Sequence, residues 1–239
     1  FLGAVPLILY FHAYRGEWRK VWGDLELRGL LAATAGTILL LSLIMPRQAG
    51  LTWAQTLAHN VITAVSVQTT TGFATFDVDA YSPAAKLVLM LSMGIGGGAG
   101  STAGGIKIVR LLILLRLAQL AVRRTAVAAH AVVTPRLGGR ILESGDIVKA
   151  LLLLILFGVV ILASWIPFLA WGYDPIDSLF EIVSAVDTVG LSTGVTSMGM
   201  PGPLKAVLCA DRRRGRVEIR ALVIVLYPRT WLGNRMPSP

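Results

Sequence analysis

Two short threonine- and glycine-rich stretches are the residues of this chain whose types and spacing could do chemistry. One reads Thr-Thr-Thr-Gly-Phe over residues 69–73, and the other reads Thr-Val-Gly-Leu over residues 188–191. A glycine beside threonines permits backbone conformations that turn successive carbonyl groups toward one axis. A ring of such carbonyls can replace the hydration shell of a cation, so the predicted chemistry is selective cation binding at a filter. The candidate filter residues are Thr70, Thr71, Gly72, Phe73, Thr188, Val189, Gly190 and Leu191.

Each stretch follows a short, moderately apolar segment, Trp53–Gln68 or Pro175–Val186, that predicts a helix too short to cross a bilayer. Aligning Gly72 with Gly190 reveals an internal repeat of 118 residues, with the order span, half helix, filter-like loop, span. Irregular backbone at membrane depth is tolerated where protein buries it or where it lines a water-filled path. Ordinary turns that end two re-entrant helices are the alternative, but two loops in register favour a pore.

A glycine-rich block between residues 94 and 107 interrupts an apolar run that would otherwise form one long helix from Ala84 to about Val122. Because each glycine destabilises a helix by roughly 1 kcal/mol, we expect the span to break here and to form a flexible gating loop below the filter. Close helix packing is the alternative, although packing needs small residues only at every fourth position. A phosphate-binding loop is excluded because the GK[ST] ending is missing. The candidate gating residues are Gly96, Gly97, Gly98, Gly100, Ser101, Thr102, Gly104, Gly105 and Lys107.

The composition indicates a membrane protein that lies in a lipid bilayer. Hydrophobic residues make up 55% of the 239 residues and charged residues only 15%, where a soluble domain carries about a quarter. The apolar residues gather in blocks, and the longest, Ile147–Trp171, can cross a hydrocarbon core of about 30 Å. Buried helices of a large soluble protein are the alternative. The other blocks are Gly29–Met45, Ala84–Ile95 and Ile106–Val122.

The basic residues set the expected orientation. They cluster around residues 15–28 and 107–149, whereas residues 46–85 and 172–204 are poor in lysine and arginine. Positive segments stay in the cytoplasm, so the two filter-like loops belong outside. The net charge of +9 therefore reflects membrane topology, and no nucleic acid is expected as a partner. The single cysteine and three scattered histidines provide no cofactor or metal cluster, and no catalytic constellation is present, so an enzyme is not expected.

These motifs together resemble the Trk/Ktr/HKT superfamily of cation transporters. The resemblance rests on TTTGF at residues 69–73, GGGAGSTAGGIK at 96–107, TVGLSTG at 188–194 and GRVE at 215–218, in matching order. It implies an all-α membrane protein built from repeated helix–pore-loop helix–helix units, like those of potassium channels, with two of an expected four units in this chain. It further implies potassium transport in a bacterial or archaeal plasma membrane, with K⁺ at the filter as the only metal. A homodimer bound to cytoplasmic nucleotide-binding regulatory subunits is the implied assembly.

The resemblance also assigns roles along the chain. Arg216 would be the basic residue that faces the cavity below the filter, set against Glu218 and the gating loop. Lys107 would help to set gating, although it could equally extend to the inner membrane interface. The implied division is residues 1–28 for the end of a preceding transmembrane helix and a cytoplasmic loop, 29–125 for the third repeat, 126–146 for a cytoplasmic linker, and 147–239 for the fourth repeat.

Two features depart from the family pattern. The first two repeats are missing, and the apolar run Phe1–His12 is interpreted as the tail of a span in a sequence incomplete at its N-terminus. The charged run Asp211–Arg214 replaces an apolar approach to Gly215, where each charge at a bilayer centre costs about 2.5–3.5 kcal/mol. A non-functional or truncated fragment is therefore one alternative to a potassium transporter. A secondary transporter of an organic solute is another, although such a site needs polar residues in the spans, and those before the last helix carry almost none.

Overall fold

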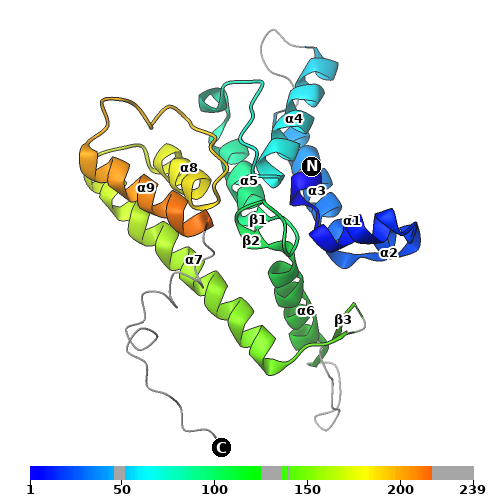
Figure 1. The fold of residues 1–239 in the computed structure, drawn as a ribbon. Coiled ribbons are helices and arrows are strands. Elements are labelled where there is room, and N and C mark those ends of the chain that lie inside the picture. The colour runs from blue at the N-terminus through cyan, green and yellow to red at the C-terminus, as the bar shows by residue number, and fades with distance from the viewer. Residues whose placement is uncertain (46–51, 125–135, 139, 217–239) are drawn as a thin grey trace, which may run out of the picture.

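Helices dominate the structure, a computed structural model that describes residues 1–45, 52–124, 136–138 and 140–216. Two helices are long and apolar enough to cross a membrane, α3 (Leu25–Ile44) and α7 (Ser144–Ala170). Much of α7 is exposed, including Leu152, Ile155 and Leu162, which agrees with contact to lipid. In Figure 1, α7 runs along one side of the molecule with α8 and α9 against it, and α3 lies on the other side beside α4 and the N-terminal helices.

Two shorter helices have the bounds that the apolar segments predicted: α4 spans Trp53–Gln68 and α8 spans Pro175–Val186. Both starts are capped, which fixes where each helix begins. Thr52 and Gln55 form a reciprocal capping box at α4, while the Asp174 carboxylate accepts from the amides of Ile176 and Asp177 at α8. The two short helices predicted from the sequence are therefore confirmed.

The predicted break in the second span is also confirmed. Helix α5 (Pro83–Gly94) ends where the glycine block begins, and α6 (Ile108–Arg124) starts where it ends. Between them the chain loops out and returns, so that two short strands, β1 (Ile95–Gly96) and β2 (Ile106–Lys107), pair in parallel. An all-α expectation did not include this pair, which satisfies backbone groups that the interrupted helix leaves open.

The N-terminal run does not form a single helix end. A 3₁₀ turn (η1, Leu2–Ala4) precedes α1 (Leu7–Tyr14), because Pro6 disfavours helical geometry at Val5. The turn instead packs on the glycine-rich loop, where the amides of Gly98 and Thr102 donate to the carbonyls of Ala4 and Gly3 at 2.9 and 3.1 Å. The interpretation of Phe1–His12 as one continuous span tail is therefore wrong for the first six residues.

A short helix and a small hairpin complete the described part of the chain. Helix α2 (Trp18–Gly23) follows α1 across a turn in which Glu17 contacts Lys20 and His12, and these hydrogen bonds lower the pKa of the Glu17 carboxyl. The strands β3 (Arg136–Leu137) and β4 (Arg140–Ile141) pair in antiparallel fashion before α7. Most of the expected linker, residues 125–135, lies outside the described residues.

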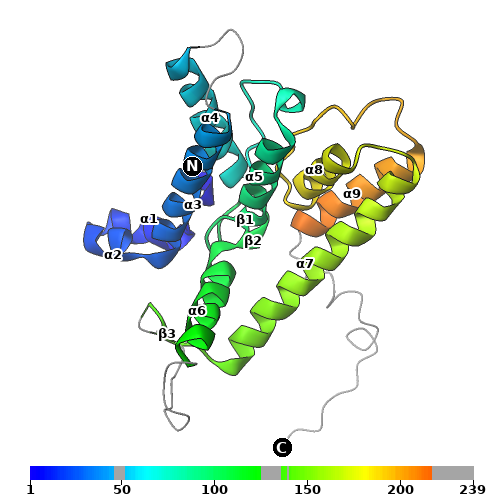
Figure 2. The ribbon, with the colours of Figure 1, turned by 180° about the vertical axis from the view of Figure 1, so that it is seen from behind.

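Apolar packing joins the two halves of the chain. One buried cluster contains Leu41 of α3, Val67 of α4, Leu89 of α5 and Phe180 of α8. A second cluster joins α7 and α8 to α9 (Gly202–Arg216) through Phe168, Ile182 and Leu204. Figure 2 shows α8 held between α5 on one side and α7 and α9 on the other. This core places the C-terminal ends of α4 and α8 close to one another.

A buried polar chain should contribute measurably to this packing. The Ser92 hydroxyl lies 3.1 Å from that of Thr37 and donates to the Gln68 side chain at 3.0 Å. We expect Ser92→Ala to lower the free energy of unfolding by about 0.5–1.5 kcal/mol, because it removes both contacts inside the bundle. Thermal unfolding in detergent measures this loss. Leu91→Ala, at an exposed neighbouring position, should change stability far less, and an equal effect would contradict the prediction.

Candidate ion pathway

The two filter-like loops begin with turns of the same backbone conformation, one at the end of α4 and one at the end of α8. Thr70 and Thr188 have φ of 54° and 57°, and no other non-glycine residue in the described ranges has a positive φ. In each turn the next backbone amide donates to a backbone carbonyl: the Thr71 amide to the Ser66 carbonyl and the Val189 amide to the Ser184 carbonyl, at 2.9 Å each. This is the Schellman ending of a helix, in which a glycine usually takes the left-handed position. A β-branched threonine is strained there, which points to a role for its hydroxyl group.

A serine one turn earlier organises each loop. The Ser66 hydroxyl accepts from the Phe73 amide at 2.6 Å. The Ser184 hydroxyl accepts from the Gly190 amide at 3.1 Å and donates to the Leu191 carbonyl at 2.6 Å. These bonds use the residue pair Ser66 and Ser184 that the 118-residue register aligns, and they hold the loops in fixed, non-helical conformations.

The two loops meet in space. Gly72 has a φ of 74°, and a Cβ added to it would lie 2.0 Å from the carbonyl oxygen of Val189. Gly190 has a φ of 90°, and a Cβ added to Gly190 would lie 3.0 Å from the guanidinium of Arg212 on α9. Only glycine fits these positions without strain or overlap. Beside the loops lies a polar cavity of about 340 Å³, lined by Phe1, Gly3, Thr69, Thr70, Thr71, Thr102 and Thr188.

The predicted gating loop lies directly against both filter stretches. The Gly104 amide donates to the Thr70 hydroxyl at 3.1 Å. On the other side, a Cβ on Gly104 would lie 2.1 Å from the carbonyl oxygen of Asp187 and 2.6 Å from the hydroxyl of Thr188. The hydroxyls of the strained Thr70 and Thr188 therefore both face this one residue. Gly96, Gly97 and Gly98 are tightly enclosed as well, whereas Gly100 is open.

Lys107 bonds within the predicted gating loop. Its ammonium donates to the carbonyls of Ala103 and Ser101 at 2.8 and 3.2 Å. The side chain is half-buried and turns back into the loop, so the alternative of an extension toward the membrane interface does not describe it. A further cavity of about 290 Å³ borders the same loop and is also lined by Phe157, Thr188 and Gly215.

The last helix continues through the charged run. Helix α9 reaches Arg216, and Asp211 is buried, with its carboxylate accepting from the Ser164 hydroxyl at 2.9 Å and lying 3.5 Å from Arg214. Gly215 packs tightly on the end of α8, where an added Cβ would lie 2.0 Å from the Val186 carbonyl oxygen. The predicted pairing of Arg216 with Glu218 falls on the Arg216 side chain and residue 218, which lie outside the described residues.

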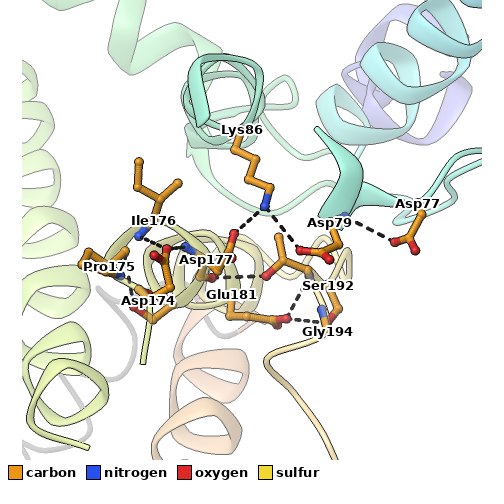
Figure 3. A network of polar contacts seen from close by, with 12 residues as sticks. Asp77, Asp79, Lys86, Asp174, Pro175, Ile176, Asp177, Glu181, Ser192 and Gly194 are labelled. Carbon is orange, nitrogen blue, oxygen red and sulfur yellow. Dashed lines mark hydrogen bonds and ion pairs between the residues drawn. The ribbon is translucent and has the colours of Figure 1, made fainter. Parts of the chain in front are cut away.

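Sequence reasoning missed a polar network at the predicted outer end of the loops (Figure 3). The buried ammonium of Lys86 on α5 donates to Asp177 of α8 at 2.6 Å and lies 3.6 Å from Asp79, so it joins the two halves of the chain. Glu181 of α8 is buried and accepts from the Thr193 amide at 3.0 Å, from Thr196 at 2.8 Å and from Ser192. A carboxylate inside an apolar half helix was the signal that could have identified it.

Apolar helices long enough to span a membrane, with short helices that end at strained loops around a glycine-rich loop, are the features of a helical membrane transport protein. Residues 49–229 match the family described as "TrkH: Cation transport protein". The chain therefore belongs to the TrkH family of cation transport proteins, which are integral plasma membrane proteins.

Individual relatives and a solved structure agree with this assignment. An uncharacterized cation transporter of Methanocaldococcus jannaschii is 31% identical over 166 residues, covering 70% of this chain and 35% of the relative. The Trk system potassium uptake protein TrkH of Salmonella typhimurium is 26% identical, covering 93% of this chain and 47% of the relative. The crystal structure of the potassium transporter TrkH from Vibrio parahaemolyticus superposes with a TM-score of 0.85 at 24% identity, covering 96% and 50% of the two chains. The chain thus spans about half or less of these relatives.

The Glu181 network generates a prediction for the outer part of the second loop. Glu181→Ala removes the acceptor of the Thr193 amide, and hydrogen bonds to a charged group contribute about 1.5–3 kcal/mol. We expect the Thr193 amide to exchange with solvent at least tenfold faster, as measured by hydrogen exchange with mass spectrometry. Glu181→Gln keeps one acceptor oxygen and should have a smaller effect. Unchanged exchange at Thr193 in Glu181→Ala would show that the carboxylate does not hold this segment.

Proposed function

We propose that this chain forms part of a potassium-conducting pore, in which residues 70–73 and 188–191 are two filter segments. The observation that carries the proposal is the matched pair of helix endings, with left-handed threonines at Thr70 and Thr188, whose loops meet at Gly72. Backbone carbonyls fixed in irregular conformations at membrane depth are suited to replace the water around a cation. The potassium transport stated in the names of the Salmonella and Vibrio relatives supports K⁺ as the ion.

The same geometry supports a repeat architecture. The sequence α3, α4, loop, α5 corresponds to α7, α8, loop, α9, with the equivalences given by the 118-residue register. In our proposal each set is one helix–pore-loop helix–helix unit, and four units surround one pore. Residues 29–125 and 147–239 then supply the third and fourth units, joined by the linker at 126–146. A homodimer with cytoplasmic nucleotide-binding regulatory subunits is the proposed assembly, with the basic linker facing those subunits.

Gating is proposed to occur by movement of residues 94–105. In the described arrangement Gly104 lies against Thr70 and Thr188, directly on the inner end of both filter segments. A loop in this place obstructs an ion that leaves the filter. The two cavities that border the loop provide space for its backbone to shift. Arg216 and Glu218 are proposed to set the electric field in the cavity below.

Substitution of the filter glycines tests the pore. Gly72→Ala forces a Cβ onto the Val189 carbonyl, and Gly190→Ala adds a Cβ at a φ of 90°, each costing about 1–2 kcal/mol in backbone strain alone. We expect at least a tenfold loss of rubidium uptake in cells that lack their own potassium uptake systems and express the protein from its complete gene. Amounts of protein in the membrane fraction should not change.

The matched controls are Gly36→Ala and Gly158→Ala. Both glycines lie inside long helices with open space where a Cβ would be, so alanine should be tolerated or slightly stabilising. Normal rubidium uptake by Gly72→Ala and Gly190→Ala, at normal expression, would refute the proposed filter.

Removal of the lysine that holds the gating loop tests the gate. Lys107→Met keeps the length of the side chain but removes the bonds to Ala103 and Ser101, so the loop should open more readily. We expect rubidium uptake to rise severalfold in the same cells. Lys149→Met removes an exposed charge elsewhere on the inner side and should leave uptake unchanged. Lower uptake by Lys107→Met, with normal expression, would count against an obstructing loop.

A further inference from the structure

Asp187 is a carboxylate that the proposed filter and gate do not use. It is the residue that follows α8, directly before the strained Thr188, and its exposed fraction is 0%. Neither carboxylate oxygen has a hydrogen-bond partner among the described residues. Two buried or half-buried lysines of the chain have other partners: Lys107 bonds within the gating loop, and Lys86 pairs with Asp177 at the predicted outer end.

The equivalent residue in the other half of the chain is fully satisfied. Thr69 follows α4 in the same backbone conformation, and its hydroxyl bonds to the Val65 carbonyl at 2.8 Å and to the Thr71 hydroxyl at 2.7 Å. The register therefore places a carboxylate in one helix ending where a satisfied hydroxyl group stands in the other. A buried charge without partners is expensive, and the negative end of the α8 dipole adds to that cost. Such a group is stabilised when it takes up a proton or when a cation meets it.

Backbone of the gating loop occupies the place where oxygen atoms converge near Asp187. A Cβ on Gly105 would lie 3.2 Å from the Asp187 Oδ1 atom, and one on Gly104 would lie 2.1 Å from the Asp187 carbonyl oxygen. The hydroxyls of Thr70 and Thr188 face the same residue, Gly104. Two hydroxyls, a carbonyl and a carboxylate thus surround a segment that carries no side chain. Hydroxyl, carbonyl and carboxylate oxygens are ligands that hard cations take.

We propose that Asp187, with the Thr70 and Thr188 hydroxyls, forms a binding site for a monovalent alkali cation. The gating loop covers this site, and the site opens when Gly104 and Gly105 move away. The inference rests on the proposed function, since it assigns an inner ion site to the same pore. With the loop in place the carboxylate is buried without a partner. With the loop displaced the carboxylate meets a cation, so the cation binds the arrangement with the loop displaced in preference to the one with the loop in place. A ligand with such a preference shifts the equilibrium toward the open loop.

Thiol labelling of the loop tests this coupling. The exposed Cys209 is first replaced by serine, and Ala103→Cys places one reporter thiol on the buried part of the loop. In the purified full-length protein we expect potassium chloride to raise the labelling rate at least threefold over N-methylglucamine chloride of equal ionic strength. Asp187→Asn, which keeps the shape without the charge, should abolish the potassium effect. Asp187→Thr, which copies the residue at the equivalent helix end, should abolish it too and provides a second variant if the first fails to fold.

Several outcomes overturn the inference. A potassium effect that persists in both Asp187 variants would show that the cation acts elsewhere. A labelling rate in the parent that responds to pH but not to potassium would make Asp187 a proton site instead. Rubidium uptake is measured in parallel, so the two proposals fail separately: a parent that transports rubidium but lacks the potassium effect refutes this site alone, and a parent without rubidium uptake refutes the proposed function.

Discussion

Backbone groups that leave a helix inside a membrane must find partners within the protein, and the centre of this structure depends on how that constraint is met. The half helices α4 and α8 end there, and so does α5 where the glycine block begins. At α4 and α8, a turn with a left-handed threonine and a buried serine satisfies the freed amides and carbonyls. At the end of α5, a parallel pair of two-residue strands performs the same task.

The helix endings depend on one another because the same few residues contact more than one of them. Gly104 contacts the turn of α4 through Thr70 and the turn of α8 through Asp187 and Thr188. Gly215 of α9 packs on the same end of α8. Such contacts are closer than any side chain allows, which explains why even alanine does not fit at these glycines unless the backbone shifts. A small movement of the glycine-rich loop therefore has to break contacts with both filter-like loops at once.

Polar side chains have two different roles in this apolar protein. At the predicted outer end, the ion pair of Lys86 with Asp177 joins the two halves. Glu181 accepts hydrogen bonds from its own half of the chain, from Ser192, Thr193 and Thr196. At the inner end of the loops, Asp187 has no partner among the described residues. The contrast is the basis for proposing Asp187 as a ligand-binding group. Asp211 is intermediate: one carboxylate oxygen contacts Ser164 and Arg214, and the other has no hydrogen-bond partner among the described residues.

Local physics made much of the framework predictable from the sequence: apolar length determined the spans and the two short helices, and glycine density determined the break between α5 and α6. The 118-residue register paired the two filter-like loops. Tertiary structure decided the contacts between these parts, such as the place of Gly104 between two helix ends and the pairing of Lys86 with Asp177, 91 residues later. The burial of Asp211 likewise depends on Ser164, 47 residues earlier. Pairings over such distances follow from how helices pack, because the chemistry of one segment does not encode its partner.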